Sequence, residues 1–295
     1  MSISKIASKI GDSATLSLNA KAAKMRSEGK PVIHLGGGEP KTKAPLDAIL
    51  AAANLLNSGE VRYVPCAGTA DMKAAVIRYT EAFYGYTPKP ENVIASSGAK
   101  QAIMVCLQAV LDPGNELLYP VPYWVSYPDM TRLCGAEPKP ITSASGSLLP
   151  SIEDFERQVT DKSKAVLINS PNNPSGVMYP REFIRDIVKF CEDRDLYLIM
   201  DDIYHRLVFD GHKPISAFEF ATKTGADSKL VVVNGVSKQY AMTGFRIGWA
   251  VGNPELIAVM SKIQTHQTSG PSVLLQKAAA AAINGPQSSV ERTCA

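Results

Sequence analysis

The feature that most constrains the fold is a regular alternation, from about Pro90 onward, of short apolar runs with helical patterns. Each run has the length of a strand and ends in a polar or glycine-rich turn. Strands that are apolar throughout are typical of a parallel sheet covered by helices on both faces. We therefore predict a three-layer α/β/α fold with a mainly parallel sheet. The runs are NVIASS, NELLYP, KAVLINS, LYLIMD, KLVVVNG and FRIGWAVG.

Composition and charge narrow the class of protein. The 295 residues, 45% of them hydrophobic, suffice for one large domain or for one domain and part of another. A net charge of +3 without a basic block argues against a protein that binds nucleic acid or a membrane surface. No window is apolar for the length of a membrane span, and the N-terminus reads as an amphipathic helix or arm and not as a signal peptide. Five scattered cysteines predict reduced thiols in a cytoplasmic protein, with no zinc or other metal site.

Polar side chains gather where the predicted strands end. A buried ionisable group is costly unless it is paired or used in chemistry. In open parallel sheets, ligands bind beyond the carboxyl ends of the strands. We therefore expect these side chains to form a single site. They are Lys100, Trp124, Asn173, Asp201, Tyr204 and Lys238.

One strand-to-helix turn has the character of an anion site. In Ser97-Gly98-Ala99-Lys100, small residues let backbone N–H groups approach a ligand, and the N-terminus of the following helix favours negative charge. The same residues would also suit an ordinary helix N-cap. Neither the Walker pattern nor G-x-G-x-x-G occurs in the chain, so the usual nucleotide-binding readings lack support.

The stretch KLVVVNGVSKQYAMTGFRIGWAVG combines a lysine and an arginine near buried strands. Desolvation lowers the pKa of a lysine such as Lys238 and makes it a nucleophile toward carbonyls. Arg246 offers a fixed fork to a phosphate or carboxylate, and Trp124 a flat face to a ring. Taken singly, these residues could be surface cations or core aromatics, and Asp201 a member of a structural ion pair. Together they favour an aromatic ring bearing an aldehyde, a phosphate and a basic nitrogen, which describes pyridoxal 5′-phosphate.

Five motifs in one order resemble a class I aminotransferase of fold type I, and most closely the bacterial and archaeal aspartate aminotransferase subgroup. The motifs are SGAKQAI, PYWVSYPDM, NSPNNPSG, DDIY and SKQYAMTGFRIGWAVG. The resemblance runs from Leu35 to about Asn284. It implies a mixed, mainly parallel sheet and the transfer of an amino group between an amino acid, with aspartate or glutamate expected, and a 2-oxo acid. The implied domains are an N-terminal arm with a small-domain segment (1–45), a cofactor-binding large domain (46–283) and the start of a C-terminal domain (284–295).

The resemblance also implies a role for each catalytic residue. Lys238 would hold pyridoxal phosphate as a Schiff base and then move a proton between substrate and cofactor. Asp201 would pair with the pyridine nitrogen, while Asn173 and Tyr204 would hydrogen-bond the ring oxygen. Trp124 would stack on the ring. The phosphate would be held by Gly98, Ala99, Lys100 and Arg246.

Other implied roles concern the substrate and a second subunit. Gly38 would contact the substrate carboxylate through its backbone, and Trp124 and Asn173 would also line the substrate site. Tyr63 would reach the phosphate of a neighbouring subunit, which implies a homodimer with shared active sites. The Val121–Pro122 and Asn173–Pro174 peptide bonds are expected to be cis.

Two departures from the family pattern bear on function. Gly235 stands where many relatives have a Ser or Thr that touches the phosphate, and Ser237 cannot be assumed to replace it. After AAAAAINGPQSSVERTCA the chain stops, where the family continues into a small domain that carries the arginine for the substrate α-carboxylate. We therefore keep two alternatives open. One is a truncated, non-catalytic chain that binds cofactor or pairs with another subunit, and the other is a β-eliminating lyase or synthase of the same fold.

Overall fold

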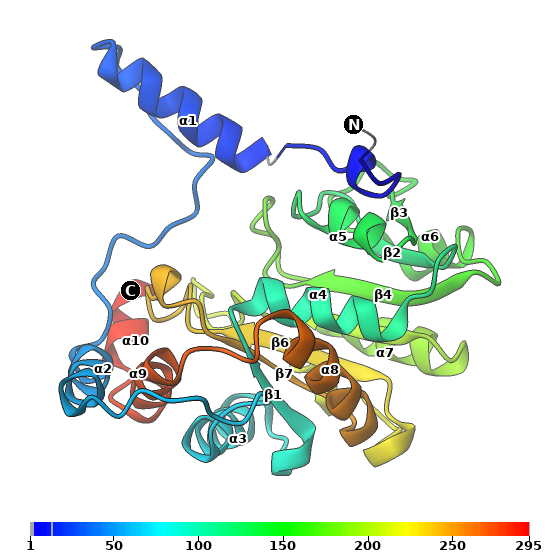
Figure 1. Ribbon diagram of the computed structural model, residues 1–295. Helices are drawn as coiled ribbons and strands as arrows, with labels where there is room; N and C mark the ends of the chain where they lie inside the picture. The colour runs from blue at the N-terminus through cyan, green and yellow to red at the C-terminus, as the bar shows by residue number, and fades with distance from the viewer. Residues whose placement is uncertain (1–2, 13, 295) are drawn as a thin grey trace.

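A seven-stranded mixed sheet forms the centre of the computed structural model, which describes residues 3–12 and 14–294 (Figure 1). The strand order is β1-β7-β6-β5-β4-β2-β3. Strand β7 runs antiparallel to both of its neighbours, and all other neighbouring pairs are parallel. The predicted mainly parallel sheet is therefore confirmed. The strands are β1 (Val93–Ser96), β2 (Glu116–Pro120), β3 (Glu137–Ile141), β4 (Ser163–Asn169), β5 (Tyr197–Asp201), β6 (Leu230–Gly235) and β7 (Gly248–Val251).

Helices cover both faces of the sheet, which completes three layers (Figure 1). We call one side the α4 face; it carries α4 (Ala99–Val110), α5 (Tyr127–Leu133) and α8 (Pro254–Gln267). The other side, the α3 face, carries α3 (Ala70–Tyr84), α7 (Arg181–Asp193) and α9 (Val273–Asn284). The remaining helices are α1 (Ala14–Ser27), α2 (Leu46–Ser58), α6 (Ile152–Glu156) and α10 (Ser288–Cys294), with 3-10 turns at Ala7–Lys9, Pro90–Asn92, Ala217–Glu219, Gly225–Asp227 and Thr243–Phe245.

Alternation along the strands divides the apolar side chains between two cores. On β5, Leu198 and Met200 pack into the core of the α3 face, whereas Ile199 packs into that of the α4 face. Because successive side chains of a strand point to opposite faces, Asp201 lies on the side of Ile199. On β6, Val233 likewise faces α4, and its neighbour Asn234 faces α3. Adjacent polar residues at a strand end therefore serve different faces of the sheet.

The structure departs from the sequence-based expectations at a few elements. The edge strand β3 has the sequence EPKPI and was not anticipated, because two prolines remove ladder donors and mask the strand pattern. Strand β6 ends at Gly235, so Lys238 lies in the following turn and not in the strand itself.

Three X–Pro bonds among the described residues are cis. Val121–Pro122 and Asn173–Pro174 are cis as predicted, and Ser170–Pro171 is cis as well. Among residues 3–12 and 14–294, no helix combines the length and the apolar composition needed to cross a bilayer.

The N-terminal part of the chain lies largely apart from the sheet. Helix α1 stands clear of it, at the blue end of the colour scale in Figure 1. The segment that follows runs back along α1, where Asn19 Oδ1 lies 2.6 Å from His34 Nε2. At the other end of the chain, Val290 of α10 is buried in the core of the α3 face. The domain boundaries at 45 and 283 stay a prediction, and Met1, Ser2, Ser13 and Ala295, which fall within the predicted terminal domains, lie outside the described residues.

Candidate active site

A cavity of about 200 Å³ opens at the carboxyl edge of the parallel strands. The carboxyl ends of β4, β5 and β6 meet there, and the N-terminus of α4 begins at the same edge. Since β7 is antiparallel, the segment that precedes it also returns to this edge. The cavity brings together eight of the predicted site residues: Ala99, Lys100, Trp124, Asn173, Asp201, Tyr204, Lys238 and Arg246.

Asp201 is a buried carboxyl group at the floor of the cavity. It accepts a hydrogen bond from the Tyr127 hydroxyl at 2.7 Å and a longer one from the Ile203 amide at 3.4 Å. Burial raises its pKa to about 6, although these two donors act in the opposite direction. Within the described part of the chain no Lys, Arg or His forms an ion pair with it. The site therefore holds an acidic group suited to a cationic ligand atom.

Lys238 is half-buried, and its amine points into the cavity. Its Nζ donates to the Gly38 carbonyl at 2.6 Å and lies 5.8 Å from the centre of the Tyr204 ring. Desolvation lowers the pKa of Lys238, the positive charge of Arg246 lowers it further, and Glu39 acts in the opposite direction. A lowered pKa increases the fraction of neutral, nucleophilic amine at a given pH.

The turn before α4 and the side chain of Arg246 form a cradle of donors. Gly98 has a φ of +90°, and a Cβ there would lie 2.4 Å from Arg246 Nη2, so only glycine leaves room for the guanidinium. Arg246 Nη1 donates to the Thr243 carbonyl at 2.9 Å and lies 3.5 Å from Ser237 Oγ. With the N-terminus of α4 beside it, this arrangement suits an oxyanion such as a phosphate.

Lys100 lies at the same cradle but is oriented toward the aromatic side of the cavity. Its Nζ lies 4.7 Å from the centre of the Trp124 ring. Burial lowers the pKa of Lys100, and the charge of Arg246 adds to this effect. The Lys100 amine therefore lies beside the ring of Trp124.

Two asparagines link the ends of β4 and β5. Asn169 Nδ2 donates to the Asp201 carbonyl, and the Asn173 amide donates to Asn169 Oδ1, both at 2.7 Å. Burial raises the pKa of the Tyr204 hydroxyl to about 12 and the charge of Asp201 contributes, whereas a hydrogen bond with Asn173 opposes the shift. Tyr204 is therefore a neutral phenol that can donate a hydrogen bond at neutral pH.

Two predicted residues come from segments outside the sheet. Gly38 reaches the cavity through its carbonyl contact with Lys238, and next to it Glu39 accepts a hydrogen bond from Thr243. Tyr63 does not reach the cavity of its own chain. It is 96% exposed and lies beside the segment from Thr268 to Val273.

Several residues of the site were not singled out from the sequence. Asn169 ends β4, and the rule that polar strand ends form the site could have found it. Tyr127 stands inside the motif PYWVSYPDM, but its contact with Asp201 depends on how α5 packs. Thr243 also lines the cavity. The described residues contain no group of three or more His, Cys, Asp or Glu side chains placed to hold a metal ion.

Gly235, the departure noted at the end of β6, has a structural explanation. A Cβ at this position would lie 2.9 Å from the Ile247 carbonyl oxygen and 3.1 Å from Gly248 Cα. Because both contacts are with backbone, neither can move aside easily. The close approach of β6 and β7 therefore excludes a side chain there, and Ser237 is the hydroxyl that lies near Arg246.

Comparison with known proteins identifies the family. The family model for class I and II aminotransferases matches residues 30–293. The chain belongs to this aminotransferase family. It is 38% identical over 280 residues to an aspartate aminotransferase of Bacillus sp. (strain YM-2), covering 95% of this chain and 71% of the relative. It is 36% identical over 292 residues to the aspartate aminotransferase of Bacillus subtilis, covering 99% and 74%.

Solved aminotransferase structures share the fold. The aspartate aminotransferase of Rhizobium meliloti superposes with a TM-score of 0.93 at 36% identity, over all of this chain and 74% of the other. The Thermus thermophilus enzyme with maleate also gives a TM-score of 0.93, at 33% identity, over 99% of this chain and 76% of the other. The predictions that the chain is a fold type I aminotransferase and that it has a three-layer α/β/α fold are therefore confirmed.

Proposed function

We propose that this aminotransferase binds pyridoxal 5′-phosphate in the cavity and transfers an amino group between an amino acid and a 2-oxo acid. The observation that carries the proposal is the convergence of three features in one cavity. They are a desolvated amine on Lys238, a buried carboxyl group on Asp201 without a cationic partner among the described residues, and the anion cradle at Gly98 and Arg246.

The residues present fit this cofactor. The missing Cβ of Gly98 leaves space next to the Arg246 guanidinium, where the phosphate would bind with Ala99 and Ser237. Lys100 and Trp124 would lie beside the phosphate and the ring. The Asp201 carboxylate, which lines the same cavity, is suited to a protonated ring nitrogen, and ionic pairing would offset the cost of its burial.

The bound cofactor would supply an electron sink for the substrate α-carbon. Lys238 would anchor the cofactor covalently and then carry a proton to and from the substrate carbon, for which a lowered pKa is favourable. The neutral hydroxyl of Tyr204 and the amide of Asn173 would donate hydrogen bonds to the ring oxygen. Asn169 would hold Asp201 in place through a hydrogen bond to its backbone carbonyl, and Tyr127 through one to its carboxyl group.

The proposed substrates are aspartate or glutamate with a 2-oxo acid, in keeping with relatives named aspartate aminotransferase. Gly38, Trp124 and Asn173 would contact the substrate. Relatives from Thermus are named aspartate/prephenate aminotransferase, so prephenate is the first alternative acceptor to test.

We further propose a homodimer in which Tyr63 reaches the cavity of the other subunit. Tyr63 is almost fully exposed, and so are apolar side chains near it in sequence. On α2, Leu46 and Leu56 are 66% and 60% exposed, which is unusual for leucine unless the surface is covered by a partner. The five free cysteines are in keeping with a reducing, cytoplasmic location.

The test is a titration of the purified chain with pyridoxal 5′-phosphate, followed by addition of aspartate or glutamate. We expect a visible absorption band of the bound cofactor that is replaced, on adding the amino acid, by the band of pyridoxamine phosphate, together with release of a 2-oxo acid. Binding without this conversion would favour the non-catalytic alternative. Release of ammonia would favour the lyase, and failure to bind the cofactor would overturn the proposal.

A further inference from the structure

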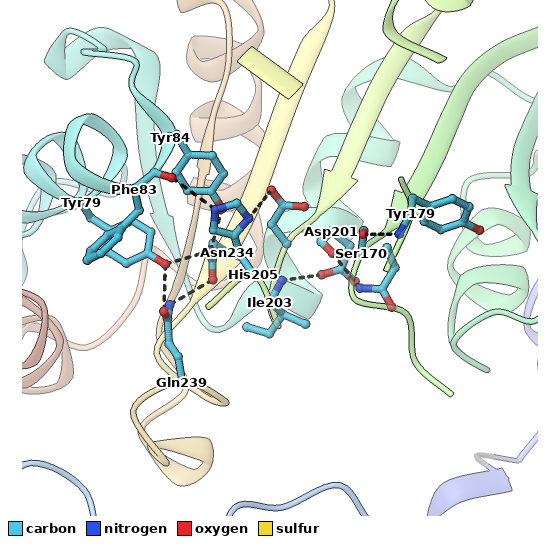
Figure 2. A network of polar contacts seen from close by, with 12 residues as sticks. Tyr79, Phe83, Tyr84, Ser170, Tyr179, Asp201, Ile203, His205, Asn234 and Gln239 are labelled. Atoms are coloured by element: carbon cyan, nitrogen blue, oxygen red, sulfur yellow. Dashed lines mark hydrogen bonds and ion pairs between the residues drawn. The ribbon is translucent and has the colours of Figure 1, made fainter. Parts of the chain in front are cut away.

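A second set of buried polar groups lies on the α3 face, behind the turn that carries Lys238. Figure 2 shows most of it on one side of the strand ends, with Asp201 on the other side. Its members come from α3, from the residues that follow β5 and from β6 with its turn. None of them lines the cavity. We call this set the α3-face network, and it consists of Tyr79, Tyr84, Asp202, His205, Asn234 and Gln239.

Gln239 is the member of the network next to Lys238 in the chain. It is only 2% exposed, and every polar atom of its amide has a partner. The Tyr79 hydroxyl donates to Oε1 at 2.8 Å. Nε2 donates to the Gly235 carbonyl at 3.1 Å and to Asn234 Oδ1 at 3.3 Å. Because an unpaired buried amide is costly, these contacts hold the side chain in one place.

Asn234 holds the other end of the same turn. Its Oδ1 accepts a hydrogen bond from the Gly235 amide at 2.7 Å, and its Nδ2 donates to the Tyr84 hydroxyl at 2.9 Å. Asn234 is 1% exposed. The turn from Gly235 to Gln239 is therefore tied at both ends to α3, and its tight approach to β7 at Gly235 leaves it no room on the opposite side.

Lys238 and Gln239 point to opposite sides of this turn, one into the cavity and the other into the α3-face network. We propose that Gln239 is a positioning residue: its buried amide fixes the turn that aims the Lys238 amine into the cavity. This inference rests on the role of Lys238 proposed above. It assigns the fixed position of that amine to hydrogen bonds on the far side of the sheet, in addition to those inside the cavity.

A structural contribution to the core alone would give a different result from positioning. Loss of the Gln239 amide would destabilise the fold in either case. Only positioning predicts that the turn relaxes and that Lys238 reaches more water, since burial is the main cause of its lowered pKa. Glu39, Tyr204 and Arg246 act on or face Lys238, and Lys100 and Asp201 line the same cavity. A change at Gln239 alters none of these groups.

The chain offers a matched control in Gln276. This residue of α9 is also fully buried, accepts a hydrogen bond from the Thr69 amide and donates one to the Pro271 carbonyl, both at 2.8 Å. It touches neither the cavity nor the turn of Lys238. Gln239→Met and Gln276→Met each remove a buried amide of the same size. We expect both variants to lower the urea midpoint of unfolding by similar amounts.

The deciding measurement is made on the cofactor-free chain. Competitive acetylation with acetic anhydride over a range of pH, read out by mass spectrometry of the peptide that contains Lys238, gives the pKa of this lysine. We expect Gln239→Met to raise the labelling midpoint by about one pH unit, which leaves about tenfold less neutral amine at a given pH. Gln276→Met should leave the midpoint unchanged.

A midpoint that is unchanged in both variants, or shifted equally in both, would overturn the proposal. If Gln239→Met does not fold, Tyr79→Phe decides, because it removes the donor to Gln239 Oε1 and keeps the ring. It should raise the midpoint in the same direction by a smaller amount, and an unchanged midpoint would refute positioning. Since no cofactor is present, this result is independent of whether pyridoxal phosphate binds.

Discussion

Asp201 and Asp202 are neighbours in the chain, and both are buried, yet they belong to opposite faces of the sheet. Asp201 lies in the cavity, where it has two hydrogen-bond donors and a pKa of about 6. Asp202 lies in the α3-face network. Its Oδ2 has no hydrogen-bond partner within the described residues, and the nearest ring nitrogen, His205 Nδ1, is 3.6 Å away.

The two environments set the two carboxyl groups to different charges. Burial raises the pKa of Asp202 well above its usual value, with the charge of Asp201 adding to the effect. Burial also lowers the pKa of His205 to about 4, and its ring stacks on Tyr84 at 4.1 Å. The α3 side therefore remains neutral and packed. The cavity side keeps an acid that can ionise when a cation binds, so the difference separates a binding group from a structural one.

The largest effect is expected from substitution of Lys238, whose amine points into the cavity. Lys238→Ala should abolish covalent capture of pyridoxal phosphate and lower transamination by about 10⁴-fold or more, because both anchor and base are lost. The check is borohydride reduction followed by mass spectrometry. Lys73→Ala is the control. Lys73 lies on α3, where burial also lowers its pKa and its Nζ donates to the Pro90 carbonyl. A reducible adduct retained at full yield in the Lys238 variant would contradict the assignment.

Exchanging each carboxyl group for an amide compares the two sides directly. Asp201→Asn should lower kcat/KM by about a hundredfold or more, since a buried charge partner of the ring nitrogen is lost. Asp202→Asn should lower it by less than about tenfold, because the group it replaces is already neutral. Steady-state kinetics of both variants with aspartate and a 2-oxo acid provides the measurement. Equal losses would mean that the two aspartates are not functionally distinct.

The pH dependence of the free energy of unfolding distinguishes Asp201 from Asp202 without a measurement of enzyme activity. An unfolded Asp ionises near pH 3.8 and native Asp201 near 6, so the native state holds the extra proton between these values. Its contribution to stability is full below about pH 4 and lost as the pH rises through about 6. A shift of this size corresponds to about 3 kcal/mol. Urea unfolding should thus show Asp201→Asn gaining up to that amount over wild type between pH 4 and pH 7.

Asp202 and His205 also affect the pH dependence of unfolding, each in its own pH range. For Asp202→Asn the gain should continue to grow above pH 6, because the pKa of Asp202 is raised further from its usual value. The lowered pKa of His205 works in the opposite sense, since its contribution is present above about 6.5 and lost as the pH falls toward about 4. His205 is unchanged in Asp201→Asn, so its effect cancels in the difference between that variant and wild type. A flat difference for Asp201→Asn across this range would contradict the raised pKa.

The smallest effect is expected from single hydroxyl groups. Tyr127→Phe removes a donor to Asp201 and should raise the pKa of that carboxyl further, with a stability cost of about 1 kcal/mol. Tyr84→Phe removes a hydroxyl from the α3-face network at a similar cost. Only Tyr127→Phe should move the pH range in which Asp201 titrates, followed by NMR of the carboxyl carbon. The same movement in both variants would show that the two sides are coupled.

Much of the site could be predicted from the sequence because its residues follow directly after apolar strands. Asp201, Asn173 and Lys238 each follow such a run, and parallel strands bring their carboxyl ends to one edge. The edge strand β3 was missed because its prolines break the strand pattern. Tyr127 was missed as a site residue because a tyrosine in a helix gives no sign of which carboxyl group its hydroxyl will meet.

The sequence by itself determined the layered fold and eight of the residues that line the cavity. These follow from local patterns of apolar residues and turns, which act over a few positions. Only the tertiary structure decided that Asp201 and Asp202 serve different faces and that Gln239 is tied to Tyr79 and Asn234. Those outcomes depend on contacts between residues distant in the chain, because burial and hydrogen bonding there are set by packing.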